Sequence, residues 1–291
     1  MAKTREFVLF SDCTMANPNG DMINENRPRQ DERTGRLEMS DVRIKRYIRD
    51  EMLNRDMKVY VKPVRNDKGK FINAAGVAAR IVKEENIKDT ELEKKLREEY
   101  LDVKLFGAVV TKPKFNITGP LQVMWSRSMH EAEVKFAQGT SVFTSKAEAD
   151  QGTIWSKYYT PYALFKTYMV FNDNTATVQK IKVSEEEIEI FKELLLNGIK
   201  NYRSTSKNQM PRLLVEVIYK NNYMDGELDY IDVKGNVSDL EIRDIKDFTF
   251  DLTPLENFYK LKSSIISEIK IYKHPKVNLI GSHESFTQYE I

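Results

Sequence analysis

The segment NPNGDMINENRPR, residues 17–29, combines side chains that donate hydrogen bonds to oxygen with residues that form turns. Asn17, Asn19, Arg27 and Arg29 carry amide and guanidinium groups, which suit the phosphate and ribose oxygens of RNA. The string Asn-Pro-Asn-Gly-Asp is equally typical of a tight turn. On these residues alone, RNA contact and turn formation are both open.

Acidic residues and one histidine are the catalytic candidates. Asp21, Asp31 and Asp41 could orient a ribose hydroxyl or hold Mg²⁺, although turn formation and helix capping explain them more simply. His130, close to Arg127, could be the general base of a metal-independent ribonuclease. A surface histidine at a strand end is the simpler interpretation.

Other signs of enzymatic chemistry are missing from the sequence. The three histidines match no metal-ligand spacing, and no phosphate-binding glycine loop or nucleophile elbow occurs. Cys13 is the only cysteine, which excludes an intramolecular disulfide and a cysteine-based zinc cluster. We therefore expect no metal and no cofactor.

Charge is unevenly distributed along the chain. Lys and Arg total 46 against 44 Asp and Glu, and this net charge of +2 does not by itself argue for nucleic acid. Residues 27–49 nevertheless hold eight basic against four acidic residues, residues 198–220 hold five against one, and residues 225–256 hold three against ten. Separated surfaces of opposite sign would suit a polyanion and a neighbouring copy, whereas scattered solvated charge is the plainer alternative.

The composition is that of an ordinary globular protein. Its 291 residues are 41% hydrophobic and 31% charged, and no apolar run reaches the roughly 18 residues of a membrane span. The first ten residues do not resemble a secretory signal. We expect no contact with a membrane, a cytoplasmic location, and either one domain with large insertions or two domains.

Hydrophobic patterns predict the elements that position the first candidates. Residues 6–11 predict a buried strand, and residues 14–39 a long loop. Ser40 is the predicted N-cap of a helix that places Arg46 and Arg49 on a basic outer face. Farther along, we expect a strand at 58–64, helices at 74–83 and 90–106, and strands at 117–125, 162–172, 212–219 and 265–272.

The second half of the chain adds one helix and two candidate loops. Ser184 and Glu187 form a predicted capping box for a helix with an apolar stripe. The segment RSTSKNQMPR, residues 203–212, follows this helix and is either an RNA-binding loop or a solvated connector. Its candidate RNA ligands are Arg203, Lys207 and Gln209.

Residues 135–157 are polar and predict a protruding loop or hairpin with a turn at Gly139. Phe136 and Phe143 flank that turn, where exposed rings would either stack on bases or anchor the loop to the body. The order strand, helix, strand, strand, helix, strand indicates an α+β fold of the ferredoxin-like βαββαβ type. This is the topology of the RNA-recognition motif (RRM).

Four segments carry a family resemblance: NPNGDMINENRPR, RTGRLEMSDVRIKRYIRD, ITGPLQVMWSRSMHEAE and TPYALFKTYMVFN. They resemble the backbone subunit of the type I CRISPR Cascade complex, the Cas7 family of the RAMP superfamily, most closely its subtype I-B branch. The resemblance extends from about residue 6 to residue 219. It implies one right-hand-shaped domain with an RRM palm at 1–55, 117–133 and 161–220, a fingers insertion at 56–116, a thumb insertion at 134–160 and a C-terminal extension at 221–291.

The resemblance also implies partners and roles. Copies of the subunit would line up along one CRISPR RNA with other Cascade subunits, and would meet target DNA through the guide. The basic helix, with Arg43, Lys45, Arg46 and Arg49, would face the RNA phosphates, and the same groove would be lined by Arg127, Lys207 and Gln209. Such subunits do not cut. The alternative is a metal-dependent endoribonuclease that cuts bound target RNA with a loop aspartate, as related type III subunits do, and Asp31 lies in the comparable loop.

Overall fold

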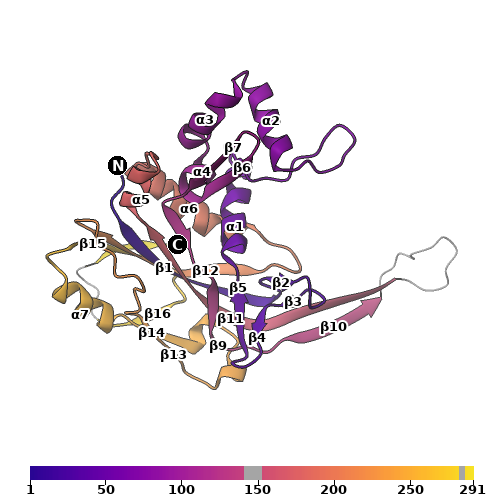
Figure 1. Cartoon of the computed structure of the whole chain (residues 1–291). Coiled ribbons are helices and arrows are strands. Elements are labelled where there is room, and N and C mark those ends of the chain that lie inside the picture. Colours follow the sequence, from indigo (N-terminus) through magenta and orange to yellow (C-terminus); the bar gives the residue numbers. More distant parts are fainter. Residues whose placement is uncertain (141–152, 282–285) are drawn as a thin grey trace.

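The computed structural model describes residues 1–140, 153–281 and 286–291, and a mixed ten-stranded sheet forms its centre (Figure 1). Helices cover this sheet, so the expected α+β class is confirmed. Eight strands follow one another across it in the order β17 (Thr287–Glu290), β15 (Ile266–Lys273), β12 (Gln209–Tyr219), β1 (Arg5–Ala16), β11 (Ile154–Phe171), β9 (Ser126–Glu131), β5 (Arg36–Met39) and β4 (Gln30–Asp31). Two more strands, β8 (Leu121–Val123) and β10 (Lys135–Thr140), pair with β11.

Strand β1 is buried on both faces, which explains its nearly continuous apolar sequence. It pairs antiparallel with β11 on one side and with β12 on the other. Phe7 and Leu9 belong to the core shared with the long helices, whereas Val8 and Phe10 belong to a second core on the opposite face. Both faces of the central sheet are therefore covered.

Helices α1 (Asp41–Asn54) and α6 (Glu185–Asn201) cover the first face. Their predicted starts are confirmed, because Ser40 is the N-cap of α1 and Ser184 forms a capping box with Glu187. The two helices approach closely at Gly198, where a Cβ atom would lie 2.4 Å from the carbonyl oxygen of Tyr47.

Residues 56–116, together with the last two residues of strand β7, form a small helical unit next to α1 (the 56–116 unit). It contains α2 (Ala74–Glu84), α3 (Leu92–Glu99), α4 (Leu101–Phe106), β6 (Gly107–Thr111) and β7 (Lys114–Thr118). The strand expected at 58–64 is wrong: the backbone amides of Tyr60 and Val61 donate to the buried carboxylate of Asp102 instead of to a neighbouring strand. The helix expected at 90–106 is interrupted at Tyr100, whose backbone is extended.

The apolar segment at 117–125, expected to be one strand, is divided between the end of β7, a bend at Pro120, strand β8, and two residues without regular structure before β9. Gly119 and Pro120 cause the break. Gly119 packs so closely on the chain that a Cβ atom would lie 2.2 Å from the carbonyl oxygen of Leu105, and proline has no N–H for a ladder.

Strands β10 and β11 form a long hairpin that projects from the body (Figure 1). Residues 135–140 pair with 154–159, and β11 then continues into the central sheet. The turn expected at Gly139 is wrong, because this residue lies within β10, opposite Trp155. Phe143 lies outside the described residues.

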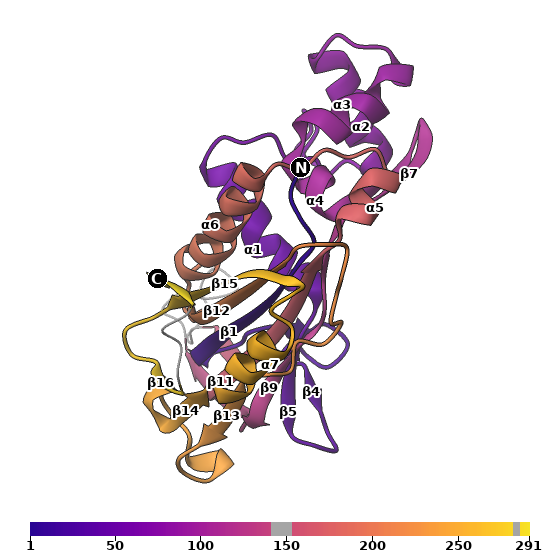
Figure 2. The same ribbon diagram turned by 90° about the vertical axis from the view of Figure 1, so that its left-hand side faces the viewer.

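The C-terminal segment covers the second face of the sheet (Figure 2). It contributes α7 (Thr253–Leu261) and a three-stranded sheet of β13 (Asp232–Gly235), β14 (Phe248–Asp251) and β16 (Asn278–Ile280). The strand expected at 265–272 is confirmed as β15, and a short helix, α5 (Asp173–Val178), follows β11. No helix in the described part of the chain is long and apolar enough to span a bilayer.

Candidate nucleic-acid interface

The first loop, within residues 14–39, is held against the rest of the fold by its own asparagines. Asn17 is 4% exposed, and its side-chain amide donates to the carbonyl oxygen of Asn26 at 2.7 Å. The side-chain oxygen of Asn19 accepts from the backbone N–H of Ser40 at 2.9 Å and from its hydroxyl at 3.1 Å, at the start of α1. Both side chains therefore shape the loop, which carries the short strands β2 (Gly20–Asp21) and β3 (Arg27–Pro28).

The outer face expected for α1 does not include Arg49, and that part of the prediction is wrong. Arg49 is 9% exposed, and its Nε lies 3.1 Å from the carboxylate of Asp102 in α4. A buried acid needs a positive partner, and Arg49 is within reach on the side of α1 that faces the 56–116 unit. The contact joins these two parts of the fold.

Other basic candidates are paired with acids inside the chain. Along α1, Lys45 and Arg46 pair with the acids four residues away from each, with N–O distances of 2.9 and 2.7 Å. Outside α1, Arg127 Nη2 lies 3.1 Å from Glu38, and Arg29 Nη2 lies 3.5 Å from Asp21. Such pairs leave less net positive charge at the surface than the sequence count indicates.

Arg43 differs from its neighbours on α1 because its guanidinium lies against two aromatic rings. Its Cζ is 4.1 Å from the centre of the Tyr47 ring and 4.6 Å from that of Tyr202. Its Nε and Nη2 are buried without a hydrogen-bond partner. Arg43 is therefore held in place by cation–π contacts, and no acid pairs with it in the part of the chain that the structure describes.

Next to Arg43, Lys207 carries a second positive charge that has no acidic partner among the described residues. Its Nζ donates to the carbonyl oxygens of Asn17 and Pro18, which fastens the 203–212 loop to the first loop. Burial, together with the positive charges of Arg43 and Lys157, lowers the pKa of Lys207 to about 8. The positive charges of Arg43 and Lys157 therefore act on this lysine in addition to its burial.

The other two candidates in residues 203–212 are Arg203, which lies at the surface, and Gln209, which is the first residue of β12 and lies in the core. Arg203 is exposed and bonds the carbonyl oxygen of Lys200, and no acid pairs with it among the described residues. Gln209 is buried, with its Nε2 2.9 Å from the sulfur of Met39 and its Oε1 unpartnered.

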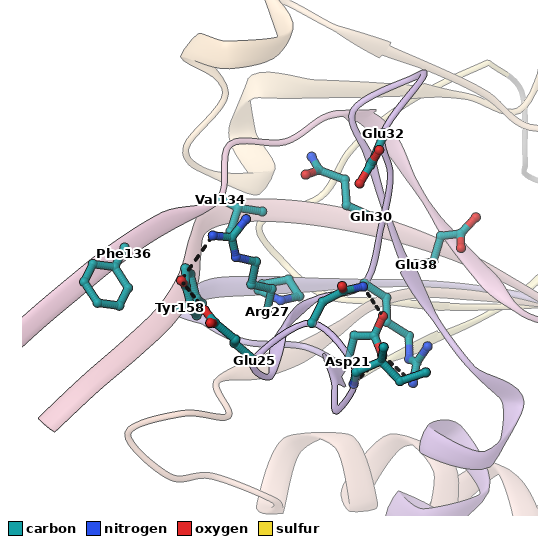
Figure 3. Close-up of a pocket in the computed structure, with 13 residues that line it drawn as sticks. Asp21, Glu25, Arg27, Gln30, Glu32, Glu38, Val134, Phe136 and Tyr158 are labelled. Carbon is teal, nitrogen blue, oxygen red and sulfur yellow. Dashed lines mark hydrogen bonds and ion pairs between the residues drawn. The ribbon is translucent and has the colours of Figure 1, made fainter.

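A cleft of about 770 Å³ separates the first loop from the base of the β10–β11 hairpin (Figure 3). Arg27 lies over the ring of Tyr158, 4.6 Å from its centre, and Phe136 packs on the other side with ring centres 4.9 Å apart. The cleft is lined by two arginines and four acids, Asp21, Glu25, Glu32 and Glu38. Its charge therefore disfavours phosphate, although Arg27, Tyr158 and Phe136 together form a partly exposed aromatic surface.

The catalytic candidates have structural roles. Asp31 accepts from the backbone N–H of Arg33 and the hydroxyl of Thr34, which lower the pKa of its carboxyl. His130 is 2% exposed, so its assignment to the surface is wrong, and burial lowers the pKa of its imidazole. No group of three or more potential metal ligands occurs within residues 1–140, 153–281 and 286–291.

Sequence reasoning missed three contributors to the positive surface. Tyr202 completes the aromatic seat of Arg43, Lys157 in β11 donates to the carbonyl oxygen of Thr205, and Tyr158 supports Arg27. Lys157 and Tyr158 lie in KYYT, which has the composition of a strand and no motif. Only the long register of β11 brings them beside the first loop and the 203–212 loop.

Comparison with known proteins gives concordant results. A family model described as "CRISPR-associated protein Cas7" matches residues 3–253. A curated CRISPR-associated protein Cas7 from Haloferax volcanii is 27% identical over 284 residues, covering 86% of this chain and 81% of the relative.

Solved structures show the same fold at low sequence identity. A chain from a structure described as "CRISPR RNA-guided surveillance complex, pre-nicking" aligns with a TM-score of 0.59 and 13% identity, over 99% of this chain and 96% of that one. A chain from a second structure, "CRISPR RNA-guided surveillance complex", aligns with a TM-score of 0.53 and 13% identity, over 96% and 95%.

Proposed function

This chain belongs to the CRISPR-associated Cas7 family, as the sequence predicted, and on that premise we propose that it is the RNA-gripping backbone subunit of a type I, I-B-like Cascade. Copies bind one CRISPR RNA along its backbone, assemble with further Cascade subunits, and present the guide for pairing with target DNA. The names of the similar structures, both RNA-guided surveillance complexes, support this assignment.

We propose that the four central strands are the RRM-like palm. Their order, β12-β1-β11-β9, with every neighbouring pair antiparallel and α1 and α6 on one face, is that of a βαββαβ unit. The 56–116 unit then corresponds to the fingers, and the β10–β11 hairpin, within 134–160, to the thumb. Residues 221–291 form the extension.

The observation that carries the proposal is a group of cations without acidic partners. Arg43, Lys157, Arg203 and Lys207 come from α1, β11 and the loop before β12, and in the described part of the chain none of them pairs with an acid. Like charges repel, so a fold gathers them at a cost unless an anion completes the site. A phosphate backbone supplies such anions at regular spacing without regard to sequence.

The face of the palm supports the same location for the RNA. RRM domains stack bases on the open face of their sheet. Here that face is the second core, in which Phe10 lies edge-on to Phe250 with ring centres 5.2 Å apart. Because the C-terminal extension covers this face, the guide runs along the side with α1 and the 203–212 loop.

Binding of labelled single-stranded RNA to matched double variants tests the proposal. Arg43→Gln with Lys207→Gln removes two unpaired charges, whereas the control, Lys45→Gln with Arg46→Gln, removes two ion-paired charges from the same helix. We expect the first variant to bind at least tenfold more weakly and to lose about 1.4 from the slope of log affinity against log salt. The control should lose clearly less.

Arg203→Gln provides a third variant, because its exposed side chain can be changed without disturbing the loop contacts of Lys207. Circular dichroism confirms that each variant is folded. Equal losses of RNA affinity in the two double variants, or unchanged binding in the first, would contradict the proposal that RNA binds at Arg43 and Lys207.

We also propose that the subunit does not cut RNA, because the carboxylate of Asp31 is hydrogen-bonded within its turn and belongs to no group of three potential metal ligands among the described residues. Guide-loaded protein is incubated with complementary RNA and Mg²⁺. We expect intact RNA with wild type and with Asp31→Ala alike. Regularly spaced cuts that disappear in Asp31→Ala would establish the endoribonuclease instead.

A further inference from the structure

Residues 62–72 form a basic hairpin at the edge of the 56–116 unit, far along the chain from the groove described above. Four of its residues are cationic, against the single acid Asp67, and all four are exposed: Lys62, Arg65, Lys68 and Lys70. Some other basic residues of this unit are neutralised, as when Lys58 pairs with Glu85 and Glu99. The four hairpin cations form no ion pair within the described residues.

The hairpin is an ordered structure with a defined turn. The side-chain oxygen of Asn66 accepts from the backbone N–H groups of Lys68 and Lys70 at 3.1 and 3.0 Å. Gly69, with a φ of +73°, closes the turn, and Arg65 Nη1 donates to its carbonyl oxygen at 2.5 Å. The cations are therefore presented on a preformed scaffold, which lowers the entropy cost of binding.

An exposed aromatic ring completes the surface. Phe71 is 63% exposed, and the guanidinium of Arg65 lies 3.9 Å from the centre of its ring. Guanidinium groups stacked on rings bind phosphates through their remaining N–H donors, and such flat pairs also stack against bases. Cations beside an exposed ring are the combination typical of single-strand binding surfaces.

The base of the hairpin lies beside α1, the helix that carries Arg43. A cleft of about 420 Å³ runs from Arg46 on α1 to Lys62, Pro63 and Ile72 at the base of the hairpin. Figure 1 shows that the loop before α2 and the β10–β11 hairpin project to the same side of the molecule. A nucleic-acid strand that follows this side meets both projections.

We propose that the 62–72 hairpin is a second nucleic-acid contact, which binds a phosphodiester backbone independently of sequence. Its ligand is either a stretch of the guide beyond the groove or the strand paired with the guide. The inference deepens the proposed function and rests on it only for the identity of these strands.

The test compares a triple variant of the full-length chain with a control of equal charge. Lys62→Gln, Lys68→Gln and Lys70→Gln are combined, and the control combines Lys234→Gln, Lys246→Gln and Lys276→Gln, which are exposed in the C-terminal extension. Labelled guide RNA is titrated with each protein, and labelled complementary DNA with each guide-loaded protein, at several salt concentrations. We expect one of the two affinities to fall about tenfold and its salt slope to fall by about 2, while the control stays close to wild type.

The two arms separate the sources of the strand. A loss confined to complementary DNA assigns the hairpin to the paired strand, and a loss in RNA binding assigns it to the guide. If the triple variant equals its control in both arms, the hairpin proposal is overturned while the proposed function stands. If wild type binds no RNA, the proposed function fails; the hairpin contact then fails with it unless the free protein binds single-stranded DNA through these lysines.

Discussion

The basic residues of this chain differ in their pairing more than in their number. Arg43 and Arg49 lie less than two turns apart on the same helix. Arg49 neutralises buried Asp102, whereas Arg43 packs on Tyr47 and Tyr202 and has no acidic partner among the described residues. An ion-paired cation gives up a partner when it binds RNA, and an unpaired one does not. Binding energy is therefore expected from Arg43 before it is expected from Lys45 or Arg46.

At the residue scale, Lys207 should make both the stability of the protein and its RNA affinity depend on pH. In the free protein its pKa is lowered to about 8 from an ordinary 10.5, so the unfolded chain holds the proton more tightly between these values. The free energy of unfolding therefore gains a contribution as pH rises from about 8 to 10.5. RNA affinity changes in the opposite direction, because phosphate favours the charged amine, and it should fall as pH rises through about 8.

Titrations of labelled RNA between pH 7 and 9 measure this effect. Lys207→Arg keeps its charge throughout the range and should flatten the profile, while any effect of pH on the RNA itself remains in both proteins. A wild-type profile no steeper than that of the variant would show that Lys207 does not contribute to the groove.

At the residue scale, the sequence indicated where the chemistry lies but not which atoms are free. Asn17, Asn19, Arg27 and Arg29 were equally compatible with RNA contact and with a turn, and the structure assigns internal hydrogen bonds to both asparagines. Partners that decide availability are distant in sequence, as Asp102 is from Arg49 and Lys157 is from Thr205. Local pattern carries no information on such pairs.

At the element scale, the groove depends on how closely α1 and α6 pack. Tyr47 and Tyr202, the two rings that hold Arg43, lie on or just after these helices and contact each other with ring centres 5.4 Å apart. Gly198 lets the backbones meet, because its missing Cβ leaves room for the carbonyl of Tyr47. The position of Arg43 is thus set by a helix–helix contact.

Gly198→Ala should therefore destabilise the protein and weaken RNA binding together. Overpacking costs about 1–3 kcal/mol of unfolding free energy. Because the added Cβ would meet the backbone of Tyr47, we expect the upper part of this range, which exceeds the roughly 1 kcal/mol that alanine gains over glycine in a helix. Urea denaturation measures the change, and Ala79→Gly, at an exposed position of α2, gives the ordinary helix-propensity difference for comparison. Gly198→Ala as stable as wild type, with unchanged RNA affinity, would contradict this role.

Elements with a strong local signal were predictable from sequence, and those set by tertiary contacts were not. Both long helices start at their predicted caps, Ser40 and Ser184. The expected strand at 58–64 failed because a buried carboxylate takes its backbone donors, and the expected strand at 117–125 failed because Gly119 meets another backbone. Neither competitor is visible within the segment itself.

At the scale of the whole molecule, the two faces of the sheet have different tasks. One face packs on α1 and α6, beside which the unpaired cations gather, and the other is sealed by the acidic C-terminal segment. Residues 225–256, with ten acids against three basic residues, lie away from the groove on the sealing side. This separation keeps negative charge away from the proposed path of the guide.

Photo-crosslinking of bound guide RNA, followed by mass spectrometry of the crosslinked peptides, tests the path of the guide most directly. We expect crosslinks between the guide RNA and residues 41–46, 155–158 and 203–212. We expect none in β14 or α7, which cover the other face of the sheet. Crosslinks confined to the C-terminal segment, with none beside Arg43 and Lys207, would contradict the proposed path of the guide RNA.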